Sequence, residues 1–146
     1  MSVSYWMIEG VGINTDKIEE SINKEKLAAM LLEQLPDDEL VLDIIKKKAY
    51  DRLDVRDFLC GEPFDNLGDL LTHCDDTDSI TYGDDGEGAS YFYYPPSMPW
   101  HHTENEPETL EEVHRRIIRA VQTITDLSGE EIEAMIDNEL YVVGIG

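Results

Sequence analysis

Side chains that could bind a metal ion gather in two stretches in the second half of the chain. They are His73, Cys74, Asp75, Asp76 and Asp78 in the first stretch, and His101 and His102 in the second. Imidazole, thiolate and carboxylate groups all bind zinc and related divalent ions. Adjacent residues seldom coordinate one ion together, however, and the metal-site spacings C-x-x-C and H-x-x-x-H are absent. The alternative is a helix end, with Cys74 on the apolar face and His73 near the last carbonyl groups. We therefore predict that the protein binds no metal ion and no other cofactor. If it does bind a metal ion, the candidate ligands are His73, Cys74, His101 and His102.

Nucleophilic catalysis would need an activated side chain, and Cys74 is a candidate because four histidines could act as its base. The aspartates that follow Cys74 oppose formation of a thiolate. Paired carboxylates can act as acid and base, but they arise by chance in a chain with 33 acidic residues. The sequence contains no Gly-rich phosphate-binding loop, nucleophile elbow or zincin motif. Residues 84–87, Asp-Asp-Gly-Glu, lack the ligand register of a calcium loop and are typical of a hairpin turn. These observations favour a protein that is not an enzyme.

Charge is the dominant feature of the composition. The 146 residues include 11 Lys and Arg against 33 Asp and Glu, which gives a formal net charge of −22. The middle of the chain, residues 57–114, contains 15 of these acids and no Lys or Arg. Such a charge steers cationic partners toward the protein and repels nucleic acid and anionic membranes. The alternative is an acidic surface that serves solubility alone.

A fixed array of carboxylates could occupy the basic groove in which another protein binds DNA or RNA. The acids expected to form such an array lie on one helix, the turn that follows it and a hairpin. They are Asp65, Asp69, Asp75, Asp76, Asp78, Asp84, Asp85 and Glu87. We predict that these side chains bind the partner.

Aromatic residues follow the hairpin turn. In a strand over 89–94, Tyr91 and Tyr93 share one face while Phe92 and Tyr94 share the other. One face must pack on the helices, and the other is either an exposed aromatic platform extended by Trp100 or a second buried face. Tyr and Trp are favoured at the centres of interfaces. Tyr91, Tyr93 and Trp100 are therefore also candidate partner-binding residues.

The elements that must position these residues indicate an α+β fold in one domain, 1–146. We expect a small antiparallel sheet, packed against several helices and built from the N-terminal strand, the central hairpin and the C-terminal strand. The expected strands are 4–13 (irregular at Gly10), 79–82, 89–94 and 140–145. The expected helices are 23–35 (capped by Asn23), 54–59, 65–74 (capped by Asp65), one from Thr109 with Glu112 and one from Ser128 with Glu131. The spacing of Leu40, Ile44 and Lys48 favours a further helix over 40–48, although residues 41–45 also fit a strand.

No stretch reaches the roughly 20 apolar residues of a membrane helix, and the N-terminus lacks the basic and apolar regions of a signal peptide. Cys60 and Cys74 are the only cysteines, too few for a disulfide framework. We therefore expect a cytoplasmic protein.

Small size, extreme negative charge and an α+β pattern together resemble phage-encoded acidic inhibitors of host defence, such as anti-restriction and anti-CRISPR proteins. The resemblance covers composition over the whole chain and transfers no individual functional residue. It implies a nucleic-acid mimic that blocks DNA or guide RNA from a basic nuclease channel. The expected partner is then a basic protein, such as a nuclease or another nucleic-acid-binding protein, with no direct binding of nucleic acid or membrane. An immunity protein or antitoxin for a basic toxin, and a small metal- or cysteine-dependent enzyme, remain alternatives, and the sequence leaves the oligomeric state open.

Overall fold

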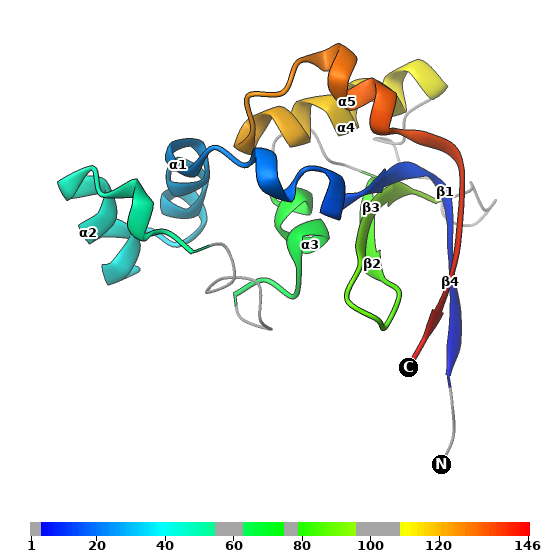
Figure 1. Ribbon diagram of the computed structural model, residues 1–146, viewed down its shortest axis with the longest axis horizontal. Coiled ribbons are helices and arrows are strands. Elements are labelled where there is room, and N and C mark those ends of the chain that lie inside the picture. The colour runs from blue at the N-terminus through cyan, green and yellow to red at the C-terminus, as the bar shows by residue number, and fades with distance from the viewer. Residues whose placement is uncertain (1–3, 55–62, 75–78, 96–108) are drawn as a thin grey trace.

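The computed structural model describes residues 4–54, 63–74, 79–95 and 109–146 (Figure 1). It contains one four-stranded antiparallel sheet with the strand order β2-β3-β1-β4, together with helices, which confirms the predicted α+β class. The strands are β1 (Tyr5–Asn14), β2 (Thr81–Asp84), β3 (Ser90–Tyr94) and β4 (Asp137–Ile145). The first and last strands pair, as the sequence predicts.

β1 belongs to two different ribbons. Its last four residues pair with β3, whereas the stretch from Tyr5 to Gly10 pairs with β4. The pairing register shifts between Gly10 and Gly12. Figure 1 shows that β1 bends along its length. Gly10 has a φ of 144°, and a Cβ at this position would lie 1.9 Å from the carbonyl oxygen of Tyr94. Only glycine fits such a conformation and such an approach, so the predicted irregularity at Gly10 is the bend of the sheet.

The described residues also form five α-helices, which lie to one side of the sheet (Figure 1). They are α1 (Lys24–Gln34), α2 (Glu39–Lys47), α3 (Leu67–Thr72), α4 (Leu110–Ile124) and α5 (Gly129–Met135). Short 3₁₀ turns precede α1 at Thr15–Lys17 and Glu19–Ser21, and a third at Tyr50–Arg52 follows α2. The helix predicted over 54–59 falls beyond Asp54, outside the described residues. None of the described helices is long and apolar enough to cross a membrane.

The helix caps match the sequence predictions at three positions and differ at one. Asn23, Thr109 and Ser128 cap α1, α4 and α5, and the Ser128 box is complete. The prediction of Asp65 as a cap is wrong, because Asn66 accepts the hydrogen bond from the N–H of Asp69 and begins α3. The carboxylate of Asp65 instead accepts a hydrogen bond from another element, as described below.

Two separate apolar clusters stabilise the fold. The main core lies between the helices and one face of the sheet, and includes the fully buried Ile13, Phe92, Leu31 and Ile117. The smaller cluster lies between the β2–β3 hairpin and the β1–β4 ribbon. Its buried members are Ile8, Tyr91 and Leu140, and Trp6, Ala89, Tyr93 and Val142 pack around them. Figure 1 shows that the β1–β4 ribbon lies at the end of the molecule opposite α1 and α2.

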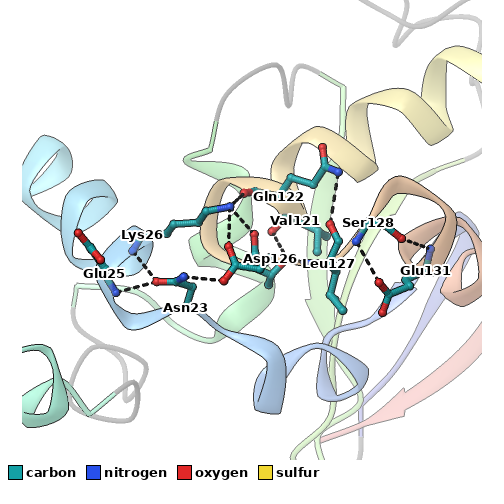
Figure 2. A network of polar contacts seen from close by, with 10 residues as sticks. Asn23, Glu25, Lys26, Val121, Gln122, Asp126, Leu127, Ser128 and Glu131 are labelled. Atoms are coloured by element: carbon teal, nitrogen blue, oxygen red, sulfur yellow. Dashed lines mark hydrogen bonds and ion pairs between the residues drawn. The ribbon is translucent and has the colours of Figure 1, made fainter.

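A polar network joins the start of α1 to the end of α4 (Figure 2). Asn23 accepts from the N–H groups of Glu25 and Lys26, and donates to the carboxylate of Asp126 at 2.6 Å. The ammonium of Lys26 donates to the carbonyl oxygen of Thr125 at 2.7 Å and lies 3.1 Å from Asp126. These partners lower the pKa of Asp126. The network holds the helical layer together and uses the charge of Lys26 within the fold.

Candidate partner-binding surface

Three of the predicted acids surround Tyr82. Its hydroxyl donates to the carboxylate of Asp65 at 2.8 Å, which links the start of α3 to β2. The pKa of Tyr82 is raised to about 12, first by this hydrogen bond, then by burial and by the negative charges of Asp69, Asp65 and Asp84. A phenolate beside carboxylates is unfavourable, and the charges of the three aspartates add to the effects of the hydrogen bond and of burial on this pKa.

The loop of the β2–β3 hairpin holds the next acids in place. Asp84 accepts a hydrogen bond from the N–H of Gly86 at 2.9 Å, and Asp85 accepts from the N–H groups of Glu87 and Ala89 at 2.8 and 3.1 Å. These contacts are those of a solvated hairpin turn, which is the interpretation that the sequence favoured over a calcium loop. Glu87 is exposed at the tip.

Lys and Arg form ion pairs with some of the carboxylates elsewhere in the described residues. Asp43 pairs with Lys47 and Arg52, Asp126 with Lys26, and Glu112 with Arg115 and Arg116. The Arg115 guanidinium is the main reason that the pKa of Glu112 is lowered to about 2. In the described part of the chain, neither Lys nor Arg forms an ion pair with Asp65, Asp69, Asp84, Asp85 or Glu87. His73 Nδ1 lies 3.8 Å from Oδ1 of Asp69, and this contact is an ion pair only when the imidazole is protonated. We call these five residues the acidic surface.

The remaining partner-binding candidates divide into two groups. Asp75, Asp76, Asp78 and Trp100 lie outside the described residues. Tyr91 is 8% exposed and belongs to the smaller cluster, while Tyr93 is partly buried. Burial raises the pKa of both hydroxyl groups. Both faces of β3 are therefore covered at Tyr91 and Phe92, and the exposed aromatic platform does not form at Tyr91.

The structure does not bring His73 and Cys74 together as ligands. Cys74 is a buried free thiol whose Sγ approaches the carbonyl oxygen of Leu70 at 3.8 Å. His73 is exposed, with Nδ1 3.0 Å from the carbonyl oxygen of Asp69 and its ring edge-on to Phe64. The helix-end interpretation is therefore confirmed for these two residues. His101 and His102 lie outside the described residues, within which no cluster of metal-ligating side chains occurs.

Sequence reasoning missed an exposed apolar surface on the β1–β4 ribbon. Its members are 43–69% exposed and alternate along the two strands: Tyr5, Met7, Tyr141, Val143 and Ile145. Tyr5 lies opposite Ile145, and Met7 lies opposite Val143. The Tyr141 hydroxyl donates to Met7 Sδ at 3.2 Å, which ties these side chains together. We call this set the outer ribbon face. The sequence did not reveal its alternating pattern, because most of the residues between its members, such as Trp6, Ile8 and Val142, are apolar as well.

A hollow of about 400 Å³ adjoins one end of this face, at the bend of β1. Its apolar walls include Val11, Tyr94 and Leu140, and Glu9 and Glu139 line it as well. In the described residues, neither glutamate has a cationic partner. The hollow therefore combines apolar walls with uncompensated negative charge.

A second groove, of about 500 Å³, runs between α4 and α5 beside His114, which the sequence did not single out. One ring nitrogen of His114 lies 2.6 Å from Oδ1 of Asn138, and the other lies 3.4 Å from a carboxylate oxygen of Glu133. A His–carboxylate pair can serve as a general base. The residues that line this groove include no Ser, Thr, Cys or Tyr nucleophile, and the contacts instead join α4 to α5 and β4.

Comparisons with protein-family models, with curated proteins and with solved structures each found no match, so the two surfaces and the hollow have to be interpreted from their own chemistry.

Proposed function

We propose that the protein is a non-enzymatic binding protein whose acidic surface docks on a basic, nucleic-acid-binding surface of a protein partner. The observation that supports this proposal is the set of five carboxylates, Asp65, Asp69, Asp84, Asp85 and Glu87, without Lys or Arg partners in the described residues. Asp43, Glu112 and Asp126 do have such partners, but so few pairs leave other exposed acids, such as Glu9 and Glu139, without Lys or Arg in the described residues too. The five acids differ from those others because they lie together, at α3 and on the β2–β3 hairpin, which pack against each other and are joined by the Tyr82–Asp65 hydrogen bond.

Nucleic-acid-binding grooves carry Lys and Arg because they must match phosphate groups along a duplex or single strand. A protein that presents carboxylates can compete for the same cations. The carboxylates on α3 and the hairpin are attached to regular structure, and the loop backbone fixes Asp84 and Asp85. Fixed groups lose less conformational entropy on binding than mobile ones. Inhibition of a nuclease or other nucleic-acid-binding protein is the expected result.

The test removes charge without removing hydrogen bonds. In the variant Asp84→Asn/Asp85→Asn/Glu87→Gln, the amide oxygens can still accept from the loop N–H groups. The matched control Glu19→Gln/Glu20→Gln/Glu33→Gln removes the same charge from exposed residues on other elements. Both variants and the parent chain are immobilised, exposed to a cell extract and eluted along a salt gradient. Retained proteins are identified, and their binding to labelled DNA or RNA is then measured with and without this protein.

We expect a basic nucleic-acid-binding protein to be retained by the parent and the control, and to elute at lower salt from the loop variant. The slope of log affinity against log salt should fall by about one for each carboxylate that no longer pairs with a cation of the partner. The protein should also displace the labelled nucleic acid. Equal retention on both variants would mean that only net charge matters, and failure to displace nucleic acid would contradict mimicry.

A further inference from the structure

The outer ribbon face is apolar on a highly charged protein. Contiguous exposed apolar patches usually mark interaction sites, whereas single exposed apolar residues are scattered over the surface of most proteins. The opposite face of the same ribbon is already covered, because Trp6, Ile8, Leu140 and Val142 pack toward the hairpin. The outer face has no such cover among the described residues.

The edge of this ribbon is also open. Ser4 and Gly146 exchange two backbone hydrogen bonds, of 2.8 and 3.0 Å. In an antiparallel ladder, hydrogen-bonded residue pairs alternate with pairs that exchange no backbone hydrogen bond. Tyr141, Val143 and Ile145 are in non-bonded pairs, and their backbone N–H and C=O groups point away from β1. The N–H of Ile145 donates to the carbonyl oxygen of Asp85 at 3.1 Å. Since β4 is the edge strand, Tyr141 and Val143 present unpaired groups within the described residues.

Both ends of the outer ribbon face are acidic. Glu9 and Glu139 lie at the end beside the hollow. At the other end the hairpin loop bonds to Ile145, which brings the carboxylates of Asp85 and Glu87 to that border. Neither β1 nor β4 contains a Lys or Arg. Two copies of the chain would set acidic ends against acidic ends in either orientation, so charge complementarity favours a basic partner over a second copy as the occupant.

We propose that the outer ribbon face and the open edge of β4 bind an extended apolar segment with Lys or Arg at both ends, carried by the basic partner. This inference rests on the proposed function and specifies the partner's chemistry. The segment adds a short strand beside Tyr141 and Val143, its apolar side chains cover Met7 and Val143, and one flanking cation enters the hollow between Glu9 and Glu139. Backbone pairing of this kind gives affinity, while the side-chain pockets give specificity.

The test uses the full-length chain labelled with ¹⁵N and synthetic peptides. The span from Glu139 to Ile145 is about 20 Å, so a peptide of about nine residues covers it. The first peptide has alternating valine and threonine between lysine pairs. The second replaces each valine by serine, and the third replaces each lysine by glutamate. The first is also titrated into the variant Met7→Gln/Val143→Thr and into a control, Leu42→Gln/Leu110→Gln, which changes exposed apolar residues on α2 and α4.

We expect the first peptide to shift the backbone signals of Met7, Tyr141 and Val143, with an affinity that falls as salt rises. Affinity should fall at least about tenfold for the serine peptide and for the ribbon variant, and should be unchanged for the control variant. Equal binding of the first two peptides, or no binding of the first, would overturn the ribbon site and leave the proposed function standing. Equal binding of the first and third peptides would instead remove the electrostatic basis of the proposed function. Shifts at the ribbon that depend on protein concentration alone would show that a second copy covers it, and would also overturn the proposal.

Discussion

Trp6 and Asp84, which are 78 positions apart in the sequence, are joined by a hydrogen bond of 2.7 Å from the indole Nε1 to the Asp84 carbonyl oxygen. The indole also lies over the end of β4, where a Cβ at Gly144 would come within 2.1 Å of the ring. Together with the bond between Asp85 and Ile145, this contact docks the hairpin loop on the β1–β4 ribbon. The docked loop completes the smaller cluster and places acidic residues at the border of the outer ribbon face.

The loop glycines provide a test of this docking. Gly86 has a φ of 77°, and a Cβ there would lie 1.7 Å from the Ile145 carbonyl oxygen. Gly88 has a φ of 106°, but a Cβ there would meet nothing within 4 Å. Gly88→Ala therefore adds only backbone strain, about 1 kcal/mol, while Gly86→Ala adds strain and overpacking, about 3 kcal/mol in all. Urea denaturation measures both. Equal losses of stability would show that the loop does not contact β4 in solution.

The environment of Tyr82 predicts an unusual titration. Its pKa of about 12 is set first by the hydrogen bond to Asp65, so Asp65→Ala, which removes the acceptor, should lower it toward 10. Because the pKa is higher in the folded than in the unfolded state, the stabilisation is present in full below pH 10. It is lost as pH rises toward about 12. Phenolate absorbance, compared between the parent and Tyr82→Phe, isolates this transition. An unchanged Tyr82 pKa in Asp65→Ala would show that the hydrogen bond to Asp65 is not the cause of the raised pKa.

Lys26 should stabilise the helical layer more than its neighbour Lys24 does. Lys26→Met removes the ammonium that binds Thr125 and Asp126 and joins α1 to the end of α4. This change should cost about 1 kcal/mol because the side chain is partly exposed. Lys24 makes a single contact of 3.5 Å to the Asp51 carbonyl oxygen. Lys24→Met should therefore leave the free energy of unfolding almost unchanged. Similar losses of stability in the two variants would contradict a specific role for the network in Figure 2.

Salt should stabilise this protein. With a net charge of −22, repulsion among carboxylates opposes the compact state, and added ions screen it. The urea midpoint should rise as NaCl is added and level off at about the concentration where the Debye length becomes shorter than the spacing of the acids. The Glu19→Gln/Glu20→Gln/Glu33→Gln variant should respond less. A midpoint that falls with salt would mean that the few ion pairs outweigh the repulsion.

The elements of this fold are determined by local sequence. Asn23, Thr109 and Ser128 start helices that an apolar stripe continues, and the aromatic and β-branched residues on either side of an Asp-Gly turn form the hairpin. Gly10 marks the bend of β1 in the sequence itself. These features were predictable because caps, turns and periodicity act over a few residues.

The surfaces depend on contacts between distant segments. Tyr5, Trp6, Met7 and Ile8 are all apolar, so period-two alternation cannot say which pair faces water, and such runs would ordinarily suggest burial on both faces. The bend at Gly10 and the docking of the hairpin on Trp6 determine which face is buried. They cover the face that carries Trp6 and Ile8, and they leave Tyr5 and Met7 exposed. The sequence by itself determined the starts of α1, α4 and α5, the strands of the sheet and the excess of negative charge. Only the tertiary structure decided that Tyr91 is buried, that Tyr82 lies among carboxylates and that an apolar face borders the acids, because those outcomes follow from pairing residues far apart in the chain.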